Sequence, residues 1–308
     1  MTERTSAADA VAAGATRKAS LLRLLRADGM ATAAAIFLVV VLLCAVFGPL
    51  LLADVAGGQN LRARNAPPFS LERGVLYILG GDALGRPLLP RIVVAAQNTI
   101  AIAAGAVLGS MVVGSTLGLV AGYSRKGASE VIMRLADVIM SFPSLLLAVV
   151  VLYILEPSVL NLVLVLAITR IPIYLRTTRA EVLEVRERMF VQAAKVLGAS
   201  TFRIVARHIL PVILPTLLTI ATLDFAFVML AESALSFLGI GIQAPEITWG
   251  LMVSQGRQYL TSAWWLAFWP GLAIILTTMS LNLLSGWMRI ALDPTQRWRL
   301  EIGGAKHD

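Results

Sequence analysis

The feature that most constrains this chain is a series of long apolar stretches, each able to cross a lipid bilayer. Residues 30–52, 92–124, 138–155 and 258–288 contain no charged side chain. A helix needs about 20 apolar residues to cross a hydrocarbon core of roughly 30 Å. Two further stretches complete a set of six: residues 157 to about 175, interrupted by Arg170, and about 212 to 235, which contain Asp224 and Glu232. The sequence therefore predicts an all-α polytopic membrane protein with six transmembrane helices.

The composition agrees with this fold class. The 308 residues are 58% hydrophobic and only 14% charged, and the mean hydropathy is +0.81. The apolar run at residues 30–52 is longer than the core of a signal peptide and continues into Gly48-Pro49, so we expect an uncleaved helix. The single cysteine, Cys44, lies in this helix and permits no intrachain disulfide.

The spans and the segments between them divide the chain into five parts. Their charge, length and position predict the following organisation: a partly disordered cytoplasmic leader at 1–29, transmembrane helix 1 at 30–52, an outer loop at 53–91, a core at 92–290 that holds helices 2–6 and a cytoplasmic segment at 176–211, and a cytoplasmic tail at 291–308.

The positive charges indicate the orientation. With the N-terminus inside, 19 of the 26 lysines and arginines fall on the inner side of the membrane. This bias is what the positive-inside rule predicts for a protein with both termini in the cytoplasm. The net charge of +8 is therefore explained mostly by topology, with membrane lipid as the surroundings and no nucleic acid as a partner.

The second span carries small residues at regular spacing. Such rows let two helix backbones approach closely in lipid, so we expect this helix to lie inside a bundle, against its own chain or a second protein. The rows are Ala101, Gly105 and Gly109, followed by Ser110, Gly114, Gly118 and Gly122.

Motifs for ATP binding and for catalysis are absent from the sequence. Gly80 and Gly85 have the spacing of a Walker loop, but Arg86-Pro87 stands where Lys-Ser/Thr is required. There is no HExxH motif, and His208 and His307 are the only histidines, which excludes a histidine-rich metal site. We expect no catalytic residue, no metal site and no cofactor in this chain.

The basic segment at 176–211 is predicted to form a helix, a sharp bend and a second helix. Gly198 suits the left-handed position that ends a helix, and Ser200 can cap the helix that follows. One helical face is apolar and includes two very small side chains, so it could insert into a groove on another protein. The alternatives are contact with anionic lipid or with the chain's own helix ends. The face consists of Phe190, Ala193, Ala194 and Leu197.

Four motifs in the chain resemble one family. Gln192-Ala193-Ala194, three residues, Gly198, nine residues and a closing "HILP" resemble the EAA loop of ABC-importer permeases. "DVIMSFPSLLLAVV", "LAESALSFLGIGIQAPEITWG" and "NLLSGWMRIALDP" are similar to the dipeptide/oligopeptide/nickel branch, in the subunit with the shorter outer loop. The likeness runs from about Gly80 to Pro294, and the motifs follow the family's order.

The resemblance implies a type I ABC-importer permease in the bacterial cytoplasmic membrane. It implies a coupling helix that docks on a cytoplasmic ATPase through Gln192, Ala193, Ala194 and Gly198. The implied partners are a second homologous permease, two ABC ATPase subunits that hydrolyse ATP, and an extracytoplasmic binding protein. The implied cargo is di- or oligopeptides, with nickel complexes, opines, glutathione or another small solute as alternatives.

The chain departs from the family's pattern at several positions. Gln192 stands where a glutamate is common, so a charge contact with the ATPase would be replaced by a neutral hydrogen bond. The outer-loop motif GTD-x-x-GRD-x-x-SR is altered, which weakens any role carried over to that loop; Ser285 and Ile290 stand where Gly and Asp are common. The altered outer-loop positions are Gly81, Pro87 and Pro90.

Two acidic residues in the fifth span are candidates for the translocation path. Asp224 lies about 18 Å along the helix, near the bilayer midplane, where a charge is costly and commonly faces a bundle interior or a water-filled cavity. It would favour cationic groups of a substrate, or it would pair with an arginine or polar group of the partner subunit. Glu232, beside a short loop at 239–249 that could gate the outer mouth, has helix-end packing as its alternative.

Two further expectations concern the tryptophans and the transport class. Four tryptophans, Trp249, Trp264, Trp265 and Trp269, are typical of the aromatic belt at a membrane interface. A secondary transporter without an ATPase is the alternative from a different class. Such proteins often show inverted repeats and several midplane ionisable groups, whereas this sequence shows no clear repeat and one deep acid.

Overall fold

The computed structural model describes residues 21–124, 126–156 and 158–292. Within these ranges the chain is built from helices and turns, and its one β-type contact is an isolated bridge between Gly81 and Pro87. The predicted all-α class is therefore confirmed. The leader up to residue 20 and the tail from 293 lie outside the described residues.

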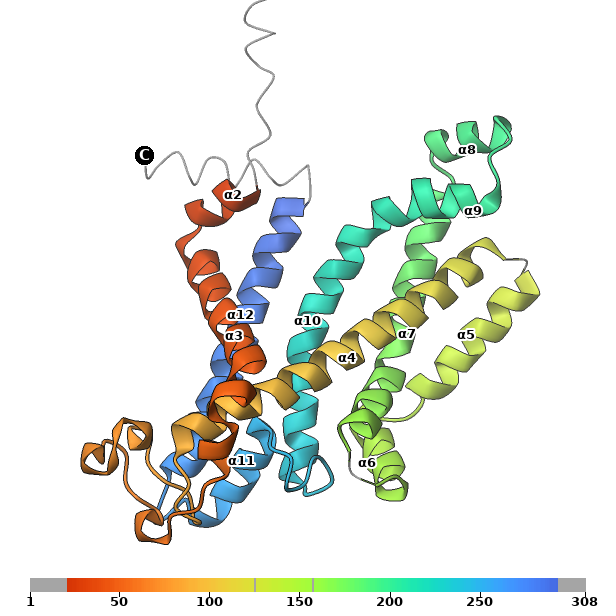
Figure 1. Ribbon diagram of the computed structural model, residues 1–308. Helices are drawn as coiled ribbons and strands as arrows, with labels where there is room; N and C mark the ends of the chain where they lie inside the picture. Colours follow the sequence, from red (N-terminus) through yellow and green to blue (C-terminus); the bar gives the residue numbers. More distant parts are fainter. Residues whose placement is uncertain (1–20, 125, 157, 293–308) are drawn as a thin grey trace, which may run out of the picture.

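Five helices are long and apolar enough to cross a membrane, and a bent pair of shorter helices makes a sixth if it counts as one span (Figure 1). α10 continues backwards through a π-helical turn, η4 (Val205–Ile209), into α9 (Thr201–Ile204). The five long helices are α3 (Gly29–Gly57), α4 (Leu88–Tyr123), α7 (Val159–Val185), α10 (Leu210–Phe237) and α12 (Trp265–Leu292).

The span predicted at 138–155 is wrong as a single helix. Three residues lie between the end of α5 (Lys126–Met140) and the start of α6 (Ser144–Ile154), and the two axes are bent by 83°. Pro143 explains the break, since its ring disfavours helical backbone at the residue before it and it cannot donate an N–H. At 11 residues, α6 is too short to cross the membrane alone.

The small residues of α4 let it pack closely against α7. A Cβ added to Gly114 would lie 2.6 Å from the carbonyl oxygen of Ile171, and one added to Gly118 would lie 2.6 Å from the Cβ of Thr178. Such distances leave no room for a side chain, so glycine at these positions sets the helix separation. The helix that approaches the small-residue rows therefore belongs to the same chain.

The shorter helices and loops gather at two opposite ends of the helical bundle (Figure 1). α2 (Leu21–Ala27), the last turn of α12, α8 (Met189–Val196) and α9 lie at one end of the bundle, called here the α8 end. α6 and α11 (Trp249–Gly256) lie at the opposite end, the α11 end, together with the long loop between α3 and α4. This loop and the segment after α11 contain the short 3₁₀ turns η1 (Leu61–Ala63), η2 (Leu71–Arg73), η3 (Val75–Tyr77) and η5 (Arg257–Tyr259).

Candidate functional site

The predicted helix–bend–helix is present at the α8 end. Gly198 has φ +79° and follows α8, with its N–H bonded to Lys195 O at 3.0 Å and the N–H of Ala199 bonded to Ala194 O at 3.0 Å. This pair of bonds is the Schellman motif, which needs a residue in the left-handed region. Ser200 Oγ then accepts the N–H of Arg203 at 3.4 Å and caps α9. Both local predictions, the bend at Gly198 and the cap at Ser200, are confirmed.

One side of α8 is anchored to the bundle. Val191 is buried, and it packs in a cluster with Val182 and Val185 at the end of α7 and with Ile209, the last residue of η4 before α10. Gln192 Nε2 donates to the backbone carbonyl of Arg186 at 3.0 Å. A glutamate could not donate to that carbonyl, so the departure at Gln192 has a local structural reason.

The other side of α8 is apolar and exposed to solvent. Ala193 lies on this exposed side, whereas Ala194 is half-buried and packs toward the bundle. Several large apolar side chains left exposed on neighbouring helices are typical of a protein interaction site. The patch, called here the α8–α9 face, consists of Ala193 and four large residues that are 82–87% exposed: Met189, Val196, Leu197 and Phe202.

Asp224 forms a buried ion pair in the middle of the bundle. Its side chain is 1% exposed, and Arg170 of α7 donates through Nε to Asp224 Oδ1 at 2.6 Å. The guanidinium of Arg170 also lies over the ring of Phe227, 4.2 Å from its centre. Asp224 is thus paired within its own chain, while its Oδ2 is buried without a hydrogen-bond partner among the described residues.

The helix that carries Arg170 is longer than the hydropathy pattern indicated. The sequence predicted a span that stops near residue 175. Instead α7 continues through Pro172 to Val185, so that Arg170 lies near the middle of the helix. Its side chain is 18% exposed, and the carboxylate of Asp224 supplies the counter-charge inside the bundle.

Glu232 lies at the other end of α10 and is fully buried. Its carboxylate accepts hydrogen bonds from Ser236 and Thr248 at 2.8 Å each and from Ser233 at 3.4 Å. Thr248 is also the N-cap of α11, since its Oγ1 accepts the N–H of Leu251 at 3.1 Å. Glu232 therefore joins the end of α10 to the start of α11, across the loop for which a gating role was considered.

Replacing Glu232 tests this joint. Glu232→Leu should destabilise the protein by about 1–3 kcal/mol, because two buried hydroxyl donors lose their acceptor. Glu232→Gln keeps an acceptor oxygen and should cost less. The measurement is the melting temperature of the purified protein in detergent, with the exposed Glu156→Leu as the control. Equal melting temperatures for all three variants would contradict a role for Glu232 in joining the helices.

Two of the four tryptophans do not form an interfacial belt. Trp249 and Trp265 are buried, at 2% and 7% exposure. Their ring N–H groups donate to backbone carbonyls, from Trp249 to Ile92 at 2.8 Å and from Trp265 to Gly81 at 3.3 Å. Trp264, in contrast, is half exposed. The expectation is wrong for the buried pair because they fix α11 and α12 to the start of α4 and to the loop before it.

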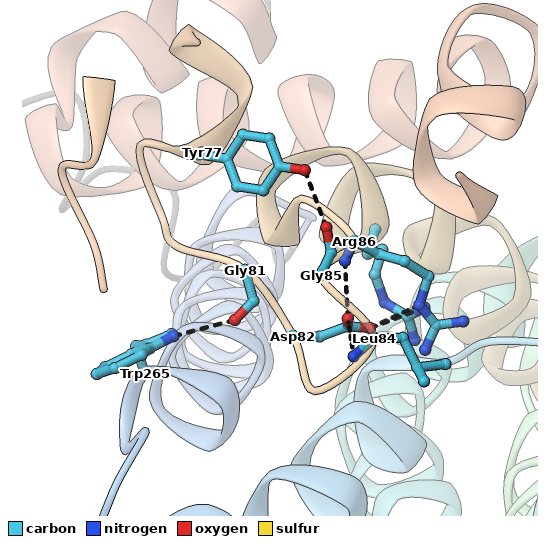
Figure 2. A network of polar contacts seen from close by, with 8 residues as sticks. Tyr77, Gly81, Asp82, Leu84, Gly85, Arg86 and Trp265 are labelled. Carbon is cyan, nitrogen blue, oxygen red and sulfur yellow. Dashed lines mark hydrogen bonds and ion pairs between the residues drawn. The ribbon is translucent and has the colours of Figure 1, made fainter. Parts of the chain in front are cut away.

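Sequence reasoning missed a second polar centre, at the α11 end. Figure 2 shows Asp82 at the middle of a network in the loop before α4. Its Oδ1 accepts the N–H groups of Leu84 and Arg86 at 2.8 Å each, and its Oδ2 accepts from Arg86 Nε at 2.6 Å. Tyr77 donates to Gly85 O at 2.9 Å and closes the turn. The signal in the sequence was one acid followed by two arginines, Arg86 and Arg91, within ten residues.

Comparison with known proteins identifies the class. Residues 114–298 match the family described as "Binding-protein-dependent transport system inner membrane component". This match contains α7 to α12, and hence the α8–α9 face, Asp224 and Glu232. The chain belongs to this family of permease components.

Individual relatives cover most of the chain. The di/tripeptide transport system permease protein DppC of Pseudomonas aeruginosa is 39% identical over 84% of this chain and 86% of its own length. The probable D,D-dipeptide transport system permease protein DdpC of Escherichia coli is 37% identical over 90% of this chain and 91% of its own. The glutathione transport system permease protein GsiD of Pectobacterium atrosepticum is 37% identical over 70% of this chain and 72% of its own length.

Proposed function

We propose that this chain is one of two permease subunits of an ABC importer for dipeptides in the bacterial inner membrane. The cargo is supported by the relatives, of which several are named as dipeptide or peptide permeases. In this proposal the chain crosses the membrane six times, with α5 and α6 together as one crossing and the α8 end in the cytoplasm. Two ATPase subunits and a binding protein complete the transporter.

The α8–α9 face carries the proposal. Its exposed apolar residues belong to α8 and α9, at the end of the bundle that holds the basic segment 176–211 (Figure 1), so a cytoplasmic ATPase is the partner that fits. Each residue of the EAA-like motif has a role in this docking. Ala193 leaves space for close contact, Ala194 lets α8 approach the bundle, Gly198 makes the turn into α9, and Gln192 fixes α8 to the end of α7.

The anchoring of α8 suggests how force reaches the membrane. α8 packs on the end of α7 and leads through α9 and the π-helical turn directly into α10. When ATP binding closes the ATPases, movement of α8 would therefore shift α7 and α10 together. Only a difference in ATP affinity between the two states can drive such a change. The outcome is alternating access of the path to the two sides of the membrane.

The roles of the two acids follow from their contacts. We assign to the Arg170–Asp224 pair the task of holding α7 and α10 together as they move, and to Glu232 the task of joining α10 to α11. A place for Asp224 on the translocation path stays a prediction. Its support is the midmembrane position expected from the sequence and a buried Oδ2 for which the described residues supply no hydrogen-bond partner.

Transport by a reconstituted system tests the proposed function. Proteoliposomes would contain this chain, its cognate second permease and both ATPases, with the binding protein added outside. We expect uptake of dialanine that requires both ATP and the binding protein. Uptake of glutathione or a nickel complex instead of dialanine would contradict the cargo alone. Uptake driven by an ion gradient without ATPases would contradict the importer and favour a secondary transporter.

A further inference from the structure

A pocket of about 300 Å³ opens at the α11 end, away from the α8–α9 face. One wall is the loop before α4 and the first turn of that helix, and the other is the end of α11 with η5. The volume is at the lower limit of small-molecule sites, and a dipeptide is of that size. Its polar lining residues are Asp82, Arg86 and Arg91 on the first wall and Gln255, Gln258 and Tyr259 on the second.

Arg91 is the unusual member of this lining. It is 3% exposed, yet it is a guanidinium with five N–H donors. Among the described residues its one ion-pair partner is Asp82, with Nη1 3.4 Å from Oδ2, and no acceptor is placed for a well-formed hydrogen bond. A buried charge is tolerated where it is paired and hydrogen-bonded, so this arginine is short of acceptors.

Asp82 alone cannot satisfy Arg91. Its Oδ1 accepts two backbone N–H groups and its Oδ2 accepts Arg86 Nε at 2.6 Å, so one acceptor site on Oδ2 is left for the five N–H donors of Arg91. Two guanidiniums therefore share one carboxylate, and the wall of the pocket carries an excess of one positive charge. A second carboxylate in the pocket would restore neutrality and supply the acceptors that Arg91 lacks.

We propose that this pocket binds the C-terminal carboxylate of a peptide, with Arg91 as the residue that recognises it. A guanidinium matches a carboxylate by paired hydrogen bonds. The amides of Gln255 and Gln258 and the hydroxyl of Tyr259 can bond the adjoining peptide group. The inference rests on the proposed function and deepens it, because it assigns this chain a part in selecting peptides with a free C-terminus.

Uptake of dialanine by the complete transporter, with binding protein at a saturating concentration, tests the assignment. Arg91→Gln should lower uptake about 10-fold, because hydrogen bonds to a charged group are lost. Arg91→Lys, which keeps the charge without the fork, should recover part of it. Arg64→Gln alters an exposed arginine in the same loop and should match the wild type.

A second variant keeps the test informative if Arg91→Gln fails to fold. Gln258→Glu places an acid in the pocket, where it can pair with Arg91 and occupy the position of the peptide carboxylate. Uptake should fall about 10-fold while the melting temperature does not fall, because the variant adds a partner for a buried charge. Uptake within 2-fold of wild type in both Arg91→Gln and Gln258→Glu would overturn the inference.

The carboxylate could also come from an acidic side chain of the binding protein. In that case Arg91→Gln would raise the binding-protein concentration needed for half-maximal ATPase stimulation and leave maximal uptake unchanged, which would overturn the assignment to the peptide. An unchanged half-maximal concentration with lowered maximal uptake would support it. Failure of the wild type itself to take up dialanine with ATP would overturn the proposed function, and with it the cargo of this pocket.

Discussion

Replacing Asp224 with asparagine is expected to destabilise the protein by about 3 kcal/mol, the lower end of the cost of breaking a buried ion pair. The change leaves the Arg170 guanidinium inside the bundle, with 18% of its side chain exposed and no counter-charge. The measurement is the melting temperature in detergent. Asp137→Asn is the control, since its pair with Arg176 is about half exposed and should contribute less than about 1 kcal/mol.

A double variant separates charge from packing. Arg170→Leu with Asp224→Leu removes both charges and should restore most of the lost stability, because an apolar pair often replaces a buried ion pair without cost. A melting temperature equal to wild type in Asp224→Asn alone would show that the pair does not hold α7 to α10. Uptake of cationic and neutral dipeptides by Asp224→Asn tests the path role, since an equal change for both would contradict it.

Replacing Ala193 with arginine is expected to abolish coupling between this chain and the ATPases. The residue is exposed at the centre of the α8–α9 face, so a long charged side chain should prevent docking without disturbing the fold. We expect stimulation of ATP hydrolysis by the loaded binding protein to fall more than 10-fold, because the few hot-spot contacts near the centre of an interface cost about 2 kcal/mol or more when they are lost.

Ala128→Arg provides the matched control for this coupling variant. Ala128 is also exposed, and it lies in α5, outside the α8–α9 face. Its ATPase stimulation should equal that of wild type, and both variants should keep the wild-type melting temperature. If Ala193→Arg retained full stimulation and still co-purified with the ATPases, the α8–α9 face would not be the docking surface.

Local signals in the sequence were sufficient for several parts of the fold. Hydropathy located the long helices because crossing a bilayer needs a continuous apolar run. The bend at Gly198 and the cap at Ser200 follow from interactions over a few residues, which neighbouring side chains determine. The rows of small residues on α4 indicated close packing, although they could not indicate that α7 was the partner.

Contacts between distant residues could not be read in the same way. Arg170 and Asp224 are 54 positions apart, and their pairing depends on the depth and rotation of two helices. The continuation of α7 through Pro172 to Val185 could not be read from the sequence either, because proline commonly ends or kinks a helix. Asp82 was missed for a different reason. Its two arginine partners are close in sequence, but Asp82 also accepts backbone N–H groups of a turn, and side-chain patterns do not show such contacts.

Cysteine cross-linking at the α8–α9 face tests the central claim most directly. Cys44 is the only cysteine in the chain, so Cys44→Ala gives a background for Leu197→Cys, on α8's exposed side, and Leu260→Cys, at the opposite end. In the assembled transporter, a short reagent should join Leu197→Cys to an ATPase subunit, with a yield that changes when ATP binds, and should not join Leu260→Cys to it. An ATPase that co-purifies with the chain but never cross-links to Leu197→Cys would contradict the account.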